Sequence, residues 1–516
     1  MCSFNDAAKL WHQSLLGRIA VALIGGALSV LTLPPFSLIF LTPIVWSALL
    51  VSLTALPPRA GALVGLAFGL SHFAFGLSWI SQSFYVDAER FGALAVPAVA
   101  GLSTLLAIFP AVACGAFALL SRHVGTGVFS AVLLSSLWTG GEWLRGHLLT
   151  GFPWNLSGYA VTDYSPFRQT AAWIGSYGMS FLIVLIGSLP GAALLLRGSA
   201  RLTAIAASLA LPAFLALLGL FRVHFTEAPA TGVTIRVVQG NFPQDEKWTS
   251  GARERALERY VSLTAAGNKA QVVLWPETAF PGYLSEDATA RARISAALSP
   301  GALLMTGVPG RIEHNQSTRY YNMIQIYDSF GTLLASYAKH HLVPFGEYMP
   351  LPNWLPLSRL VDAAADFSAG SGPSTIILPG VPPVAPVICY EIIFPGHIIV
   401  PDSRPAWIFN ATNDAWFGMS MGPKQHLASA QMRAVEEGLP VVRAANTGIS
   451  AIIDANGQIL AKLDPGVTGF LEAELPSAMP RTPYSRWGDS LLAALLALCW
   501  TTWALRRCLR RSTSRC

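Results

Sequence analysis

The stretch Gln271-Val-Val-Leu-Trp-Pro-Glu-Thr278 is a short apolar run that ends in a proline and a carboxylate. An apolar run of this length, bounded by turn residues, predicts a buried β-strand. Proline has no N–H to donate to a strand ladder, so Pro276 ends the strand. We therefore expect Glu277 to project from the carboxyl edge of this strand.

From Val233 to Asp454 the chain repeats the same pattern, with short apolar strands separated by helical or turn-rich segments. Strands that alternate with helices predict α/β layers. Hairpin turns are expected at Asp328–Gly331 and Asp454–Gly457. The expected strands are Val233–Gln239, Gln271–Trp275, Ala302–Gly307, Tyr321–Tyr327, Leu333–Lys339, Pro386–Tyr390, Trp407–Asn410, Val441–Ala444 and Ala451–Asp454. The expected helices are Arg253–Ala265, Ala288–Ala297 and His426–Glu437.

Composition separates this α/β part from the rest of the chain. Of the 516 residues, 53% are hydrophobic and 12% are charged, whereas a soluble protein carries about 25% charged residues. Residues 1–221 hold 14 charged side chains, and residues 222–487 hold 42. This distribution excludes an ordinary soluble globule and a disordered chain, and it predicts a membrane protein with one large aqueous domain.

Apolar stretches long enough to cross a bilayer, about 20 residues, recur before and after the aqueous domain. We predict a polytopic α-helical membrane bundle of about eight transmembrane helices, an aqueous domain over 222–487 and a basic tail over 506–516. The Lys/Arg distribution places both termini in the cytoplasm and the aqueous domain on the other side of the membrane. The predicted spans are 16–34, 37–56, 60–81, 92–120, 124–141, 171–196, 202–221 and 488–505.

One loop of the membrane part is rich in aromatic and glycine residues. It contains Gly141-Glu-Trp-Leu-Arg-Gly146 and Gly151-Phe-Pro-Trp-Asn155. Aromatic residues favour the membrane interface, so this loop has two interpretations, an aromatic belt or a lipid-handling surface near the active site.

The charge distribution bears on nucleic-acid binding, and the cysteine content bears on catalysis. The net charge of +6 lies in the membrane flanks and the tail, while residues 222–487 are slightly acidic, so a nucleic-acid partner is not expected. Cys389 is the one cysteine in residues 222–487. A lone thiol in a compartment that can be oxidising invites a chemical explanation.

Glu277, Lys339 and Cys389 each follow or end a predicted strand. Loops at the carboxyl ends of strands carry catalytic groups that the sheet holds rigidly. A carboxylate could take the proton of a thiol, and an ammonium could lower the thiol pKa and stabilise an oxyanion. Each residue also has a structural interpretation, since the Glu could be solvated, the Lys could simply end a strand and the Cys could act as a small hydrophobe. Together they indicate acyl transfer through a thioester.

Longer motifs make the chain resemble the nitrilase, or carbon–nitrogen hydrolase, superfamily, and within it the membrane branch of apolipoprotein N-acyltransferases. The resemblance spans nearly the whole chain and includes the aromatic loop of the membrane part. The motifs are Gln239–Gln244 with Lys247-Trp248, Trp275–Thr278, Tyr337–Pro350, Ile388–Glu391, Asn413–Gly418, Gln431–Ala434 and Asn446–Gly448.

This resemblance implies a four-layer αββα domain that faces the periplasm from a bacterial inner membrane. It implies a ping-pong reaction in which Cys389 takes an acyl chain from a phospholipid, typically phosphatidylethanolamine. The amine of the diacylglyceryl-cysteine of an apolipoprotein then receives that chain. Glu277 is the implied base, and Lys339 with a backbone N–H near Tyr390 holds the oxyanion. No cofactor and no metal are implied.

The resemblance also suggests supporting residues. Glu347 resembles a carboxylate that orients Lys339 or Glu277, while Tyr390 and Glu391 match mobile or pocket-lining positions. Candidates for contact with substrate, or for a lid dipping into the membrane interface, are Trp248, Trp354, Leu355 and Trp416.

Three other interpretations stay open beside acyl transfer. A membrane-tethered amidase of the same superfamily would hydrolyse a small soluble amide. A scaffold would bind lipoproteins without chemistry, although an intact Glu277–Lys339–Cys389 set argues against it. His340 invites a Cys–His protease interpretation, but the strand neighbour of Lys339 points to the opposite face.

Overall fold

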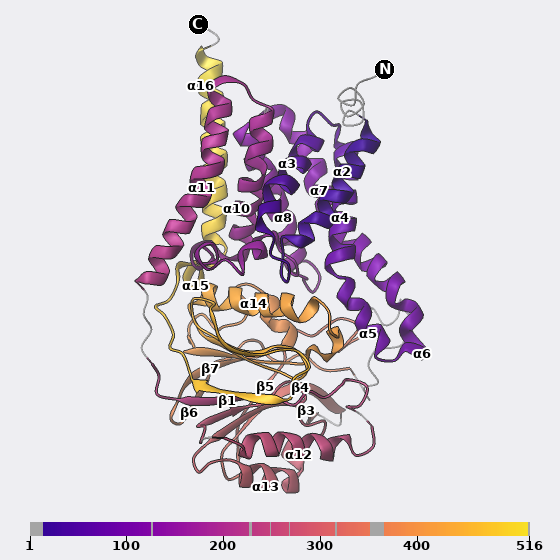
Figure 1. The fold of residues 1–516 in the computed structure, drawn as a ribbon, viewed down its shortest axis with the longest axis vertical. Coiled ribbons are helices and arrows are strands. Elements are labelled where there is room, and N and C mark those ends of the chain that lie inside the picture. The colour runs from indigo at the N-terminus through magenta and orange to yellow at the C-terminus, as the bar shows by residue number, and fades with distance from the viewer. Residues whose placement is uncertain are drawn as a thin grey trace. The chain divides into compact units, whose positions relative to one another are not determined.

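A computed structural model describes residues 14–124, 127–225, 230–247, 249–267, 269–314, 317–350 and 366–513 (Figure 1). Contacts divide the chain into two compact units. The first, the helical unit, takes in the chain up to Ser78, then Val96–Phe225 and the residues from Pro483 onward. The second, the catalytic unit, combines Trp79–Ala95 with Thr226–Thr482.

The helical unit consists of apolar helices whose glycines allow close packing. A Cβ on Gly26 of α2 would lie 2.1 Å from the carbonyl oxygen of Phe68 in α4, so only glycine fits at this crossing. A break at Gly175 divides α10. The helices are α2 (Leu15–Leu31), α3 (Thr42–Leu53), α4 (Pro58–Gly76), α7 (Ala95–Val124), α8 (Val128–His147), α9 (Ser165–Arg168), α10 (Ala171–Leu194), α11 (Gly198–His224), α15 (Pro483–Trp487) and α16 (Ser490–Thr513), with 3₁₀ turns η1 (Ile39–Leu41) and η4 (Ser157–Val161).

Several helices of the described chain suit a membrane, but the number eight stays a prediction. By length and composition, Ala88–Val124, Ala171–Leu194 and Gly198–His224 are long and apolar enough to span a bilayer. Pro58–Gly76 and Ser78–Tyr85 would make a fourth span as a pair bent by 46°. Three shorter apolar helices are Leu15–Leu31, Ile39–Leu53 and Ser490–Leu505. The predicted span 124–141 corresponds to α8, which runs on to His147 and carries Glu142 and Arg145.

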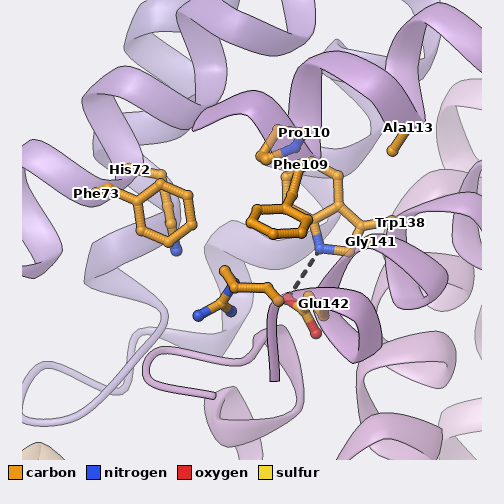
Figure 2. Close-up of a pocket in the computed structure, with 9 residues that line it drawn as sticks. His72, Phe73, Phe109, Pro110, Ala113, Trp138, Gly141 and Glu142 are labelled. Carbon is orange, nitrogen blue, oxygen red and sulfur yellow. Dashed lines mark hydrogen bonds between the residues drawn. The ribbon is translucent and has the colours of Figure 1, made fainter. Parts of the chain in front are cut away.

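The aromatic loop of the membrane part has internal polar residues and an exposed Trp143, and both of its interpretations stay predictions. Glu142 and Arg145 are buried, as is Trp154. Glu142 Oε1 accepts Trp138 Nε1–H at 3.0 Å, and Arg145 donates to the carbonyl oxygen of Trp154 at 2.7 Å. Trp138, Glu142 and Arg145 line a cavity with room for about one water molecule (Figure 2). The loop buries its polar groups because they satisfy backbone and side-chain partners inside the bundle.

The catalytic unit contains two six-stranded sheets. In the first, β1, β2 and β3 run parallel, and β12, β4 and β5 extend the sheet antiparallel. In the second, β7, β8 and β9 run parallel, and β6, β10 and β11 extend it antiparallel. The strands are β1 (Thr234–Gln239), β2 (Val272–Leu274), β3 (Leu303–His314), β4 (Ser317–Tyr327), β5 (Leu333–Ala338), β6 (Ile376–Leu378), β7 (Val381–Ile388), β8 (Trp407–Thr412), β9 (Val441–Ala445), β10 (Ser450–Ile453), β11 (Ile459–Leu463) and β12 (Gly469–Glu474).

Apolar residues from both sheets share one core, which includes Val237, Leu274, Trp407 and Val442. A second core joins the other face of the first sheet to α12 (Ala252–Ala265) and α13 (Ala288–Ala297). α14 (Gly422–Glu437) covers the second sheet (Figure 1). These layers form a nitrilase-like αββα sandwich, and the predicted two-sheet fold is confirmed.

The sequence pattern predicts most of these elements but misses three strands, β6, β11 and β12. β11 alternates between half-buried and exposed residues, and β12 is mostly half-buried, so neither contains a continuous apolar run. Both predicted hairpin turns form. Asp328 Oδ1 accepts the N–H of Thr332 at 2.8 Å, and Asp454 Oδ1 accepts that of Gln458 at 2.8 Å.

The segment Trp79–Ala95 overlaps the ends of the predicted spans 60–81 and 92–120 but belongs to the catalytic unit. It contains most of η2 (Ser78–Ile80), then α5 (Ser81–Tyr85), α6 (Ala88–Phe91) and η3 (Gly92–Leu94). The rings of Trp79 and Phe417 meet edge to face at 4.3 Å, and Ser83 Oγ donates to the carbonyl oxygen of Trp416 at 2.9 Å.

Candidate active site

Glu277 lies just beyond the carboxyl end of β2, as the proline at 276 predicts. Its side chain is buried, and the residue after it, Thr278, has a φ of 49°. β3 passes directly behind this turn at Gly307, where a Cβ would lie 2.5 Å from Glu277 Cα. A glycine at 307 is therefore required to let the sheet approach the carboxylate.

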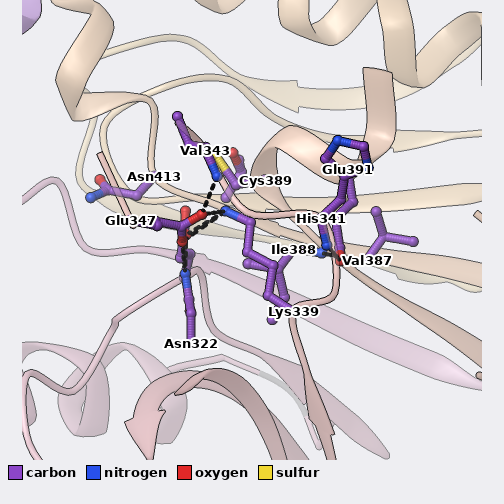
Figure 3. Close-up of polar contacts among 12 residues, drawn as sticks. Asn322, Lys339, His341, Val343, Glu347, Val387, Ile388, Cys389, Glu391 and Asn413 are labelled. Atoms are coloured by element: carbon purple, nitrogen blue, oxygen red, sulfur yellow. Dashed lines mark hydrogen bonds and ion pairs between the residues drawn. The ribbon is translucent and has the colours of Figure 1, made fainter. Parts of the chain in front are cut away.

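Lys339 follows β5 and is 1% exposed. Its Nζ lies 2.8 Å from Glu347 Oε2 and 3.7 Å from Glu277 Oε1 (Figure 3). Burial lowers the pKa of Lys339, but the carboxylates of Glu347 and Glu277 outweigh it and the net pKa is raised. The ammonium is therefore charged at any physiological pH.

Asn322, on β4, connects the two carboxylates. Its Nδ2 donates to Glu277 Oε1 at 2.7 Å and to Glu347 Oε1 at 2.8 Å. The backbone carbonyl oxygen of Asn322 accepts the backbone N–H of Lys339 at 2.9 Å. One residue thus fixes the spacing of two anions and one cation.

Cys389 lies at the junction of β7 and the 3₁₀ turn η6 (Cys389–Ile393). Its φ is 49°, a conformation that strains a residue with a Cβ and that recurs at functional sites. Burial raises the pKa of the thiol, and Glu277 adds to this, while Lys339 lowers it. The thiol is therefore neutral at rest at neutral pH, and an adjacent base is needed to activate it.

Glu391 is fully buried and links the segment that carries Cys389 to the segment that carries Lys339 through hydrogen bonds. Its Oε2 accepts the N–H of Ile388 at 2.7 Å, and its Oε1 accepts the N–H of His340 at 2.8 Å. Burial raises the pKa of Glu391, but hydrogen bonding and charge from His340 outweigh it and the net pKa is lowered. Glu391 therefore connects the two segments through buried hydrogen bonds, and its predicted pocket-lining role stays a prediction.

His340 contacts Glu391 and not the thiol. Its Nδ1 lies 2.7 Å from Glu391 Oε1 and 2.8 Å from the hydroxyl of Tyr337. These contacts give no support to a Cys–His protease based on His340.

A second charged cluster, Asp414, His426 and Arg443, lies behind Cys389. His426 Nε2 lies 3.1 Å from the carbonyl oxygen of Cys389, and its Nδ1 lies 2.9 Å from Asp414 Oδ1. Arg443 Nη2 donates to Asp414 Oδ2 at 2.6 Å. Burial raises the pKa of Asp414, but Arg443 and His426 outweigh it and lower the pKa to about 2.

Cys389, Asp414 and His426 present ligand atoms within 4.8 Å of one another, which is a possible spacing for a metal. The donor set does not fit one. Both imidazole nitrogens of His426 are engaged, and the guanidinium of Arg443 places a fixed positive charge against Asp414. A cation at this position would be repelled.

The structure brings Glu277, Lys339, Cys389 and Glu347 together, although they come from distant parts of the chain. Tyr390 is buried and its ring packs at 5.1 Å from that of Phe394. Trp416 lies half-buried in η7 (Asp414–Phe417). Trp248, Trp354 and Leu355 lie outside the described residues.

Sequence reasoning missed several polar residues of the site. Each is a common residue type inside or beside a strand or helix, where a structural role is the default. Two of them lie in motifs named above, Lys247 in Lys247-Trp248 and Asp414 in Asn413–Gly418, and these motifs were the available signal. The missed residues are Lys247, Asn322, Asp414, His426 and Arg443.

Comparison with known proteins matches both halves of the chain. Residues 25–189 match the family model for the apolipoprotein N-acyltransferase N-terminal domain, and residues 234–483 match that for carbon-nitrogen hydrolase. An apolipoprotein N-acyltransferase from Bradyrhizobium diazoefficiens is 42% identical over 520 residues, covering 96% of each chain.

The chain belongs to the apolipoprotein N-acyltransferase family.

A second family member, from Rhodopseudomonas palustris, is 40% identical over 522 residues and covers 95% of each chain. Among solved structures, an amidase from Nesterenkonia sp. AN1 is 20% identical, covers 49% of this chain and 94% of its own, and has a TM-score of 0.34. The family is the membrane branch that the sequence motifs indicate, and that prediction is confirmed.

Proposed function

We propose that this member of the apolipoprotein N-acyltransferase family moves an acyl chain from a phospholipid to the N-terminal amine of diacylglyceryl-cysteine in apolipoproteins. The observation that carries this proposal is the convergence of Glu277, Lys339 and Cys389 in one buried site. A base, an ammonium and a thiol are the groups that covalent acyl transfer needs.

In the first half-reaction Glu277 takes the thiol proton of Cys389. The thiolate attacks the ester carbonyl of the phospholipid, so a C–S bond forms and the carbonyl oxygen becomes an oxyanion. Lys339, with a backbone N–H near Tyr390, holds that oxyanion. The ester C–O bond then breaks, and the leaving alkoxide of the lysophospholipid takes the proton back from Glu277.

In the second half-reaction the amine attacks the thioester carbonyl. Glu277 takes a proton from the attacking nitrogen as the C–N bond forms. The C–S bond then breaks, and the thiolate of Cys389 recovers the proton from Glu277. Glu347 and Asn322 keep Lys339 and Glu277 in place through both steps.

Membrane attachment supports transfer from a lipid over hydrolysis of a soluble amide. Exposing an acyl chain to water costs about 0.8 kcal/mol per CH₂, so the donor is best handled at the bilayer. We propose residues 1–221 and 488–505 as the membrane part, with the catalytic domain 222–487 on the periplasmic side and both termini cytoplasmic. The Lys/Arg distribution supports this orientation.

Trp354 and Leu355, which lie outside the described residues, are proposed from the sequence alone to contact the lipid donor. Replacing both with serine would slow acylation by bilayer lipid more than acylation by a short soluble ester. Equal slowing with the two donors would count against this contact.

The test is a transfer assay with purified protein in phosphatidylethanolamine vesicles. The acceptor is a synthetic diacylglyceryl-cysteine peptide with a free N-terminal amine, and the same peptide with an acetylated amine is its control. We expect an N-acylated peptide and a lysophospholipid in equal amounts, with parallel double-reciprocal plots, and no product from the acetylated peptide or from Cys389→Ala.

Two results would contradict this proposal and favour a different function. Lipid-independent hydrolysis of a soluble amide, without transfer to the peptide, would favour a membrane-tethered amidase. Lipoprotein-related function that survives intact in Cys389→Ala would favour a scaffold.

A further inference from the structure

A second lysine, Lys247, lies inside the catalytic unit beside the end of β2. It is 5% exposed, and its Nζ donates to the backbone carbonyl oxygen of Glu277 at 3.4 Å. The two half-reactions described above give this ammonium no task. Lys247 nevertheless lies next to Glu277, the proposed base.

The turn that carries Lys247 is fixed in place. The backbone N–H of Lys247 donates to the carbonyl oxygen of Gln244 at 3.4 Å, and the side chain of Gln244 accepts Asn413 Nδ2 at 2.8 Å. Asn413 Oδ1 in turn accepts Asn446 Nδ2 at 3.0 Å. These side chains are buried, so the position of the ammonium is set by the interior of the domain.

Lys247 forms no ion pair with any carboxylate in the part of the chain that the structure describes. Its neighbours Asp245 and Glu246 are exposed, whereas Lys247 is buried. Burial lowers the pKa of Lys247 to about 8, and the nearby groups that oppose this shift are Glu277 and Cys389. A buried ammonium costs free energy unless it is paired, and the hydrogen-bond acceptor of Lys247 Nζ is the backbone carbonyl oxygen of Glu277.

The charge balance of the site shows what Lys247 adds. Glu277 and Glu347 are two anions, and Lys339 is one cation bound 2.8 Å from Glu347. Moving the thiol proton to Glu277 keeps this sum negative while it places an anion on Cys389. A second cation makes the site neutral in both states. In low-dielectric surroundings such a charge acts strongly over several ångströms.

We propose that Lys247 is a positioning residue whose ammonium offsets the negative charge of Glu277 and Cys389 and thereby increases the fraction of reactive thiolate. This inference deepens the proposed function and rests on it, because it concerns the same nucleophile. Lys339 is then left to hold Glu347 and the oxyanion. The charged and titratable groups around the thiol are Glu277 after β2, Lys339 after β5, Glu347 in the loop beyond, Asp414 after β8, His426 on α14 and Arg443 on β9.

The test is the rate of Cys389 alkylation by iodoacetamide at pH 7, where Lys247 is charged, measured on the full-length protein in detergent micelles by peptide mass spectrometry. Lys247→Met removes the charge and keeps the length of the side chain, and Lys247→Arg keeps the charge. The exposed residue Lys269 provides a matched control, Lys269→Met. Cys389→Ala gives the background.

We expect Lys247→Met to be alkylated at pH 7 about tenfold or more slowly than wild type, because loss of the cation disfavours the thiolate. Lys247→Arg and Lys269→Met should keep the wild-type rate. A purely structural lysine would lower the unfolding temperature without changing the rate, and that result would overturn the proposal. An equal loss of rate in Lys247→Arg and Lys247→Met would also overturn it.

Lys247→Gln replaces Lys247→Met, under the same criterion, if the methionine variant does not fold. Alkylation needs no lipid or acceptor. Failure of wild-type protein to transfer an acyl chain would therefore contradict the proposed function, whereas an unchanged alkylation rate in Lys247→Met, with a wild-type protein that does transfer, would contradict only the role of Lys247.

Discussion

Glu391 accepts the backbone N–H of His340 at 2.8 Å and also lies 2.7 Å from His340 Nδ1. Glu391 is two residues after Cys389, the proposed nucleophile, and His340 directly follows Lys339. The pair therefore links the thiol and the ammonium through the backbone of both segments. Their alignment depends on a buried carboxylate that touches neither reacting atom.

Removal of this link should misalign the site. Glu391→Ala leaves the N–H groups of Ile388 and His340 without their acceptor, and we expect acylation of Cys389 to slow about 100-fold, as misplacement by about 1 Å can do. The unfolding free energy should fall by about 3 kcal/mol, because a buried charged partner is lost. Single-turnover acylation and thermal unfolding measure the two effects. Glu313→Ala, at an exposed position, is the control, and wild-type acylation in Glu391→Ala would show that the link is dispensable.

Asn322 should influence the reaction through the two carboxylates, those of Glu277 and Glu347, that its side chain holds apart. Its amide donates to both Glu277 and Glu347, so Asn322→Ala should slow acylation about 10- to 100-fold. Asn322→Asp has the same shape but places a third carboxylate between two others, and it should be the slower variant. Single-turnover rates of the two variants decide the point. A milder effect of the aspartate would mean that shape, and not charge, is what Asn322 provides.

Gly307 should be intolerant of any side chain. An alanine Cβ would lie 2.5 Å from Glu277 Cα and 2.6 Å from the carbonyl oxygen of Pro276. Gly307→Ala should therefore lower the unfolding free energy by about 1–3 kcal/mol and displace the base, with at least a tenfold loss of acylation. Gly469→Ala in β12 is the matched control, because no atom lies within 4 Å of its Cβ. Equal behaviour of the two variants in thermal unfolding and acylation would refute the close-packing argument.

Asp414 should make stability depend on acid pH. Its pKa is lowered from 3.8 to about 2 in the folded protein. A depressed carboxyl pKa contributes stability that is present above the unfolded value and is lost as pH falls through the folded one. The contribution is about 2 kcal/mol, and Asp414→Asn should lack it. The difference in unfolding temperature between wild type and Asp414→Asn should shrink as pH falls from about 4 to 2. A constant difference over that range would contradict the assignment.

The catalytic core was predictable because its residues lie in strong local patterns. Pro276 ends a strand, so the position of Glu277 follows from the sequence, and the motif around Lys339 and Glu347 is long and specific. Asn322 and Arg443 were not predictable, because polar residues within strands have no local signature and acquire their roles only when distant segments meet. The same reason explains the link that Glu391 makes to His340 and His341, which lie 51 and 50 residues away in the sequence.

The spans of the membrane part were harder to predict than the strands. An apolar run gives the position of a helix but not its bends, and the bend after Gly76 places Trp79 in the catalytic unit. The aromatic loop was assigned to a surface because tryptophan favours membrane interfaces. Its buried hydrogen bonds, such as Trp138 to Glu142, depend on helices that composition does not place.

The central claim is a thioester at Cys389, and intact-mass spectrometry after incubation with phosphatidylethanolamine tests it most directly. We predict that the protein gains the mass of one acyl chain, that neutral hydroxylamine removes it and that Cys389→Ala never gains it. Transfer of the acyl chain to the acceptor peptide by a protein that forms no such adduct, or an unchanged adduct in Cys389→Ala, would contradict the account.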